Sequence, residues 1–222
     1  MLQPRKKMTK REIKEDPLVT LYAKTQKWIQ QNQRYINSGL IAILAIAVVG
    51  VFMSRSKNQA ESAAESQMGV VEQYYYYRQF DRAIEGLERI VDSYAGTRAA
   101  GRACFFLANS YYENGDYQNA ESFYEQYVRE YNHIDLFSAG SLAGIAACME
   151  NRMEWLNAAE RYEKAGMQYK DLSSAPYYLK NAARCYIKAG ESEKAKTVYE
   201  TILAMSPEPS LASEIEILVE TL

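Results

Sequence analysis

GRACFFLANSYYENGDYQNAESFYEQYV, residues 101–128, decides the fold of this chain. A turn signal at Gly115-Asp116-Tyr117 separates two segments that contain no proline. Before the turn, Leu107-Ala108 is followed three residues later by Tyr111, and after it Ala120 and Tyr124 place a small and a large residue four positions apart. This order predicts two antiparallel helices joined by a short turn.

The same pattern recurs along the chain at intervals of 37, 38 and 37 residues. The small position is occupied by Ala83, Ala120, Ala158 and Ala195. The large position four residues later is occupied by Leu87, Tyr124, Tyr162 and Tyr199. Each expected first helix also carries a pair of packing residues: Val71 and Tyr74, Ala108 and Tyr111, Ala146 and Met149, Ala183 and Tyr186.

Packing explains why such a pattern repeats. Two helices approach closely only where a small side chain faces a large one, so the alanine forms the hole and the large residue fills it. One hairpin cannot bury both of its apolar faces, and stacking of successive hairpins does so. The final segment 210–222, SLASEIEILVETL, carries an apolar stripe at Leu211, Ile215, Leu218 and Leu222 and is expected to cap the stack. The sequence therefore predicts an all-α solenoid of about four hairpins.

Residues 101–128 resemble the consensus of the tetratricopeptide repeat (TPR) family, with Leu107-Ala108 at the family's Leu-Gly position. Pro207 stands where that family closes a repeat with proline. The resemblance implies repeats at about 64–97, 101–134, 139–172 and 176–209, with the cap at 210–222. The period exceeds the usual ~34 residues, so about one extra helical turn is expected between repeats.

Residues 35–53, YINSGLIAILAIAVVGVFM, contain no charged side chain. As a helix they rise roughly 28 Å, which is sufficient to cross a bilayer. Residues 1–55 contain ten Lys/Arg and three Asp/Glu, whereas residues 56–222 contain sixteen Lys/Arg and twenty-five Asp/Glu. Nine of those ten basic residues precede the span, which predicts a cytoplasmic N-terminus and places residues 54–222 outside the cytoplasm. A cleaved signal peptide is less consistent with the long region before the span and the lack of a small-x-small site.

Residues 1–16 are expected to form a basic cytoplasmic tail, followed by an amphipathic helix over residues 17–34 that lies along the inner membrane surface. Asp16-Pro17 is typical of a helix start, and Lys24, Lys27 and Arg34 are placed to meet anionic lipid head groups. The alternative is a cytoplasmic extension of the transmembrane helix with interfacial aromatic residues. In both cases residues 17–53 contact the lipid bilayer.

Similarity to TPR proteins also implies a concave groove lined by the first helix of each repeat. The groove residues carried over from the family are Met68, Glu72, Tyr75, Tyr76, Arg102, Phe105, Asn109, Tyr112, Glu150, Tyr177, Lys180, Arg184 and Lys188, with small Ala143 and Ala147 in the third repeat. These residues predict an aromatic floor at one end and a basic patch at the other, of the kind that protein-binding hot spots use. The alternative is that Tyr75 or Tyr76 packs against the membrane-side helix and that the basic residues form ordinary surface ion pairs.

Motifs for catalysis, metal or cofactors are lacking in this sequence. It contains no P-loop, GxSxG, HExxH or GxGxxG pattern, and His133 is expected in a surface loop. The widely spaced Cys104, Cys148 and Cys185 match no zinc motif, although Cys148 and Cys185 share a repeat position and could be bonded or free. Residues 56–222 carry a net charge of −9, which disfavours nucleic acid. We therefore expect neither an enzyme nor a small-molecule or cofactor site.

The order of basic tail, one span and extracytoplasmic TPR domain resembles the bacterial family of ancillary SecYEG translocon subunits. That resemblance implies an inner-membrane protein with a periplasmic domain that binds proteins, acting as a scaffold or chaperone at the Sec translocon. The long N-terminal segment departs from that pattern. The alternative is a structural accessory subunit of another inner-membrane complex. Outer-membrane TPR lipoproteins are disfavoured because no lipobox cysteine follows the apolar run.

Overall fold

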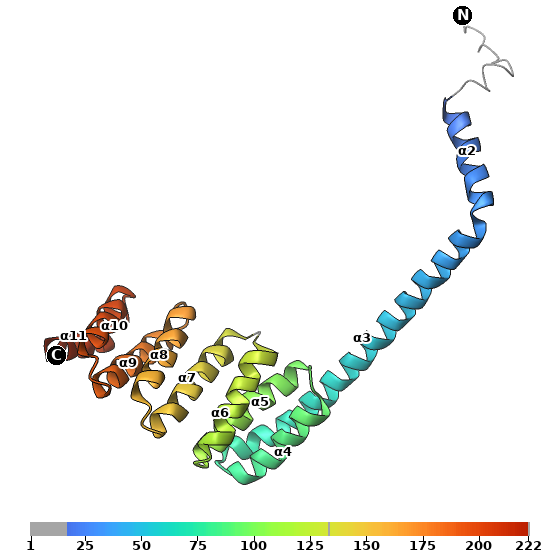
Figure 1. The fold of residues 1–222 in the computed structure, drawn as a ribbon. Coiled ribbons are helices and arrows are strands. Elements are labelled where there is room, and N and C mark those ends of the chain that lie inside the picture. Colours follow the sequence, from blue (N-terminus) through green and yellow to red (C-terminus); the bar gives the residue numbers. More distant parts are fainter. Residues whose placement is uncertain (1–16, 133, 222) are drawn as a thin grey trace, which may run out of the picture. The chain divides into compact units, whose positions relative to one another are not determined.

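The computed structural model describes residues 17–132 and 134–221, and these residues form helices joined by short turns with no strand among them (Figure 1). The helices are α2 (Pro17–Gln31), α3 (Gln33–Tyr76), α4 (Phe80–Ser93), α5 (Arg98–Glu113), α6 (Tyr117–Gln126), the π-helix η1 (Tyr127–Tyr131), α7 (Asp135–Asn151), α8 (Trp155–Gln168), α9 (Ala175–Lys188), α10 (Ser192–Ala204) and α11 (Pro209–Glu220). The prediction of an all-α fold is confirmed. The expected basic tail 1–16 and His133 lie outside the described residues.

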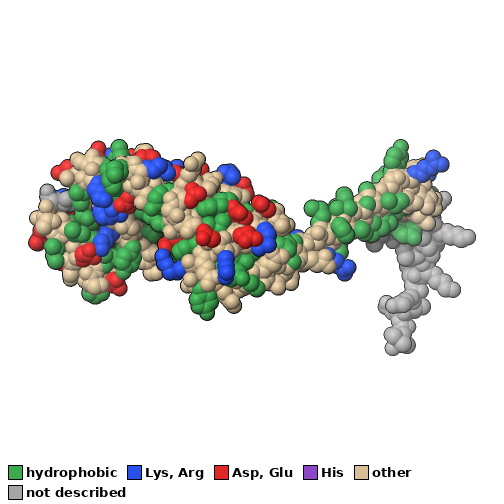
Figure 2. Space-filling model, turned by 90° about the horizontal axis from the view of Figure 1, so that it is seen from below, with side chains coloured by type: hydrophobic (Ala, Val, Ile, Leu, Met, Phe, Trp, Pro, Cys, Tyr) green, Lys and Arg blue, Asp and Glu red, His purple; other side chains and the backbone are tan. Residues whose placement is uncertain are grey.

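The chain divides into two compact units, Met1–Ser56 and Lys57–Leu222, with the boundary inside α3. In the first unit, α2 ends at Gln31 and α3 begins at Gln33. The apolar side chains of the following segment face outward; Ile46, for example, is 73% exposed. The space-filling view shows such side chains along this helix (Figure 2). By length and composition α3 is the one candidate membrane span in the described chain, and its apolar window is not buried in the protein.

The second unit, residues 57–222, is called the solenoid unit below. Its helices pack in chain order, each against its predecessor and successor from α4 to α11. The first helices of successive hairpins also contact one another, α5 with α7 and α7 with α9. The end of α3 pairs with α4 through Val71, whose methyl groups fill the space beside Gly86. A stack of helical hairpins, as predicted, is the result.

Each hairpin turn uses the same backbone conformation. Within these turns the residues with positive φ are Arg78, Gly115, Met153 and Gly190, which recur at the repeat spacing. In the second hairpin, Gly115 N–H donates to the Tyr112 carbonyl and Asp116 N–H donates to the Tyr111 carbonyl. The other three turns make the same pair of bonds. These bonds satisfy the last carbonyls of the first helix and fix the reversal of the chain.

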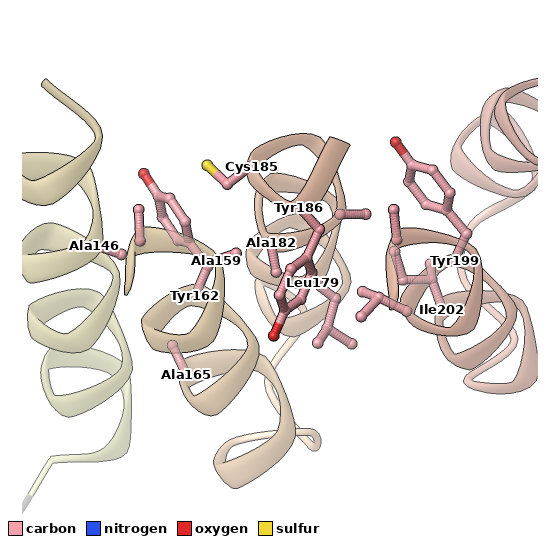
Figure 3. Close-up of a cluster of buried hydrophobic side chains, with 14 of the residues drawn as sticks. Ala146, Ala159, Tyr162, Ala165, Leu179, Ala182, Cys185, Tyr186, Tyr199 and Ile202 are labelled. Atoms are coloured by element: carbon pink, nitrogen blue, oxygen red, sulfur yellow. The ribbon is translucent and has the colours of Figure 1, made fainter. Parts of the chain in front are cut away.

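The repeated small and large residues form the core. Ala83, Ala120, Ala158 and Ala195 are fully buried, and the four large partners are at most 5% exposed. Figure 3 shows part of this arrangement, with Leu179 of α9 and Ile202 of α10 pointing toward each other beside Tyr199. The small and the large positions predicted for each hairpin are therefore buried in all four hairpins. At the C-terminal end, Leu211 and Ile215 of α11 are buried against the stack, whereas Leu222 is outside the described residues.

Candidate protein-binding face

One stripe of side chains on each first helix remains outside the core. Residues at the same four offsets are partly or fully exposed in all four helices. We call this set the first-helix face: Glu65, Gly69, Glu72 and Tyr76 of α3; Arg102, Phe106, Asn109 and Glu113 of α5; Gly140, Gly144, Ala147 and Asn151 of α7; Tyr177, Asn181, Arg184 and Lys188 of α9. Steps of four, three and four residues keep these positions on one side of a helix.

An aromatic cluster connects α3, α5 and α7 along this face. It consists of Tyr75, Tyr76, Phe105, Phe106 and Phe137, of which Tyr76 and Phe106 belong to the first-helix face and the other three pack against the core. The Tyr75 and Phe106 ring centroids lie 4.9 Å apart at a steep angle, and Phe105 and Phe137 stack at 4.8 Å. Tyr76 is 69% exposed, while the other four rings are partly buried. Rings locked by neighbouring rings offer a rigid apolar surface that loses little entropy when a partner binds.

Carboxylates border the aromatic cluster on the α3 side. The guanidinium of Arg102 bonds to Glu65 at 3.1 and 3.2 Å and to Glu72 at 3.2 Å. One cation of α5 is therefore shared by two carboxylates that belong to α3. At the end of α5, Glu113 accepts a bond from Arg78 at 2.8 Å. The face carries excess negative charge around the rings.

The predicted basic patch on α9 is occupied by carboxylates from neighbouring helices. Arg184 binds the Glu150 carboxylate through both terminal nitrogens, and the Lys188 nitrogen lies 3.8 Å from the same group. Lys180 pairs with Glu214 of α11 at 2.6 Å. The hydrogen bond from Arg184 lowers the pKa of the Glu150 carboxyl below its usual value. These contacts connect adjacent repeats, so the three cations serve first as links within the solenoid.

The remaining predicted residues differ in their exposure. Met68 is fully buried in the core between α3, α4 and α5, so its assignment to the groove is wrong. The Tyr124 hydroxyl donates to Asn109 at 2.5 Å, and the Asn151 amide donates to the Tyr112 hydroxyl at 3.1 Å. Tyr177 is 45% exposed and donates to Glu208.

Sequence reasoning missed Glu65, Phe106 and Phe137. A usable signal was present, because Phe106 lies four residues after Arg102 and three before Asn109, on the same side of α5. Gly69 takes the corresponding place on α3, in the position to which Met68 was assigned. The first-helix face thus differs from the family assignment by one residue at some positions, as with Gly69 and Met68, and agrees with it at others, such as Glu72 and Asn109.

Among the described residues, no group of three or more His, Cys, Asp or Glu side chains is placed to hold a metal ion. Cys104, Cys148 and Cys185 are buried free thiols, and burial raises the pKa of each, to about 12, 12 and 11. The alternative of a bond between Cys148 and Cys185 is therefore wrong for this structure. What the face offers is contact area and charge.

Solenoids of stacked hairpins form a class of proteins with extended surfaces that generally bind other proteins or peptides. The model of the tetratricopeptide repeat-like domain family matches residues 26–212, and the chain belongs to that family. The prediction of TPR-like repeats is confirmed.

Several solved structures share the fold at low sequence identity. A Podosopora anserina putative kinesin light chain with nearly identical TPR-like repeats is 23% identical over 65% of this chain and 75% of its own, with a TM-score of 0.53. MamA is 17% identical over 68% and 79%, with a TM-score of 0.54. YrrB, a TPR protein with an unusual peptide-binding site, is 18% identical over 86% and 96%, with a TM-score of 0.52. A search of curated protein sequences gives no match.

Proposed function

We propose that this protein is a membrane-anchored scaffold whose solenoid unit binds a segment of another protein along the first-helix face. The observation that carries the proposal is the aromatic cluster, which crosses three successive first helices and leaves Tyr76 69% exposed. Large rigid rings in this setting cost free energy in water and release it when a partner covers them. YrrB, which has the same fold, is described as having a peptide-binding site.

The membrane part of the proposal rests on composition and exposure. Residues 35–53 form the span, residues 1–16 a cytoplasmic tail and residues 17–34 an interfacial helix, while residues 54–222 lie in the periplasm of a bacterium. Outward-facing apolar side chains on α3 are what a lipid-facing helix requires, and basic residues concentrate before the span. In this location the solenoid unit acts beside the Sec translocon, holding proteins that emerge from it.

A second candidate is a structural accessory subunit of another inner-membrane complex. It is favoured by the internal pairing of Lys180, Arg184 and Lys188, which gives the α9 end of the face few free charges for capturing changing clients. A permanent neighbour would instead rely on shape and apolar contact.

Two experiments test the proposal. Reporter fusions after residue 222 are expected to be active only when the fused enzyme functions in the periplasm, and cytoplasmic activity would contradict the orientation. A photo-crosslinking amino acid at Tyr76 is then expected to give adducts in native membranes, whereas the same probe at Met167, a 50% exposed residue of α8, gives none. Equal crosslinking from both positions would place the binding surface elsewhere. Many different adducts support the translocon role, and one stoichiometric adduct supports the accessory subunit.

A further inference from the structure

The aromatic cluster has a charged border whose sign bears on what it binds. Glu65, Glu72 and Glu113 have side chains that are 43%, 25% and 37% exposed, so solvent or a ligand reaches all three. Among the described residues, the cations that pair with them are Arg102, which Glu65 and Glu72 share, and Arg78. The three carboxylates thus outnumber the two arginines by one along this part of the first-helix face.

We infer that this end of the face binds a peptide segment that combines apolar side chains with lysine or arginine. The inference rests on the proposed function and specifies the ligand of the same face. An apolar residue of the segment covers Tyr76 and Phe106, and its cation meets the carboxylates at the border.

The charge of the whole unit acts in the same direction. Residues 56–222 carry sixteen basic and twenty-five acidic side chains, and the field of this excess speeds the approach of a cationic segment. Figure 2 shows acidic side chains scattered over the visible face of the solenoid unit.

An acidic segment has no comparable place on the face. Near the aromatic cluster it would meet Glu65 and Glu72 with a single guanidinium between them. At the α9 end it would have to displace the Glu150 carboxylate from Arg184, where two hydrogen bonds already hold it. Like-charge contacts and the loss of an existing pair both oppose binding.

The test uses the full chain in phosphatidylcholine nanodiscs, a zwitterionic lipid chosen so that cationic peptides are not drawn to the membrane. Three fluorescein-labelled peptides share the same leucine and tryptophan positions and differ only in carrying three Lys, three Gln or three Glu. Fluorescence anisotropy gives their dissociation constants, and empty nanodiscs give the background.

The Lys peptide is expected to bind at least about tenfold more tightly than the Glu peptide at low salt, since each exposed pair contributes roughly 1.4- to 5-fold. The difference should shrink in ~1 M salt, where the Debye length falls to about 3 Å. The double variant Glu65→Gln/Glu72→Gln should reduce the preference for Lys. Glu113→Gln provides a second test that leaves the Arg102 contacts intact, and Met167→Ala on α8 is the matched control.

The outcomes separate the inference from the proposed function. Equal affinity for the Lys and Glu peptides, or tighter binding of the Glu peptide, overturns the inference and leaves a peptide-binding face in place. A Lys preference that Glu65→Gln/Glu72→Gln and Glu113→Gln both leave unchanged also overturns it. If no peptide binds and Tyr76 gives no crosslinks in membranes, the proposed function itself is wrong.

Discussion

Replacing Gly144 by alanine is expected to destabilise the solenoid unit, whereas the same replacement at Gly69 is expected to stabilise it. Both glycines lie inside helices and hold the corresponding place on the first-helix face. A Cβ atom added to Gly144 would lie 2.4, 2.4 and 2.7 Å from three ring carbons of Tyr124. A Cβ atom added to Gly69 has no such neighbour within 4 Å.

The magnitudes follow from these surroundings. Alanine is favoured over glycine in a helix by about 1 kcal/mol, and at Gly69 this is the only effect. At Gly144 the added Cβ atom meets the ring of Tyr124, which is 3% exposed and part of a buried hydrophobic cluster. Overpacking costs roughly 1–3 kcal/mol, and loss of the Tyr124 bond to Asn109 adds about 0.5–1.5 kcal/mol. We therefore expect a gain of about 0.5–1 kcal/mol for Gly69→Ala. For Gly144→Ala the helix-propensity gain of about 1 kcal/mol is subtracted from these costs, which leaves a loss of about 0.5–3.5 kcal/mol.

The assay is urea unfolding of the full chain in nanodiscs, followed by far-ultraviolet circular dichroism. The free energy of unfolding is compared among wild type and the two variants at one protein and lipid concentration. Changes of the same sign and size for both variants would refute the reasoning, because helix propensity alone would then account for them. Changes in unfolding free energy of opposite sign for the two variants are explained only by the contact between Tyr124 and Gly144.

Three further predictions concern charge, thiols and the turns. Because the pKa of Glu150 in the folded protein is below its usual 4.5, its contribution to stability is present above that pH and is lost as the pH falls through the lowered value. Glu150→Gln should therefore reduce the loss of unfolding free energy between pH 5 and pH 3, and an unchanged acid profile would contradict the pairing with Arg184. The three buried thiols have raised pKa values and should therefore react with iodoacetamide at pH 8 only after denaturation. Mass spectrometry measures the labelling, and rapid labelling of the native protein would argue against their burial. Gly115→Ala should lower the free energy of unfolding by about 1–2 kcal/mol, because Gly115 has a φ of 81°. Met153→Ala at the equivalent turn should change the free energy of unfolding by less than ~0.5 kcal/mol, since a side chain is already tolerated there. Equal losses for the two variants would argue against backbone strain at Gly115.

The fold was predictable because its determinants are local and repeated. Ala120 and Tyr124 lie four residues apart, and the same pair at Ala158 and Tyr162 sets the register of the next hairpin. Burial of these residues requires only that successive hairpins stack. The sequence did not show which segments hold the extra residues of each repeat. These residues are distributed over several elements, since α5 and α7 have 16 and 17 residues and a π-helix follows α6.

The candidate site was less predictable, and Met68 shows why. Neighbouring residues on a helix point about 100° apart, so an offset of one position exchanges a buried residue for an exposed one. The family offsets placed Met68 on the surface, whereas in this chain Gly69 is exposed and Met68 fills the core. The ion pairs could not be predicted from the sequence for a different reason. Glu150 and Arg184 are 34 residues apart, and nothing in the sequence says that they meet until the hairpins are stacked.

Affinity and selectivity are assigned to different residues on this face. The rings of Tyr76 and Phe106 present apolar area to any bound segment. Truncating the Tyr76 side chain should therefore weaken the binding of the Lys, Gln and Glu peptides to the same extent. The carboxylates around them add little area, yet they change the ranking of these peptides because they attract one charge and repel the other. Since Arg184 and Lys188 are occupied by Glu150, the α9 end cannot reverse that ranking without breaking a contact between repeats. Selectivity for a cationic segment thus follows from how the solenoid uses its own basic residues.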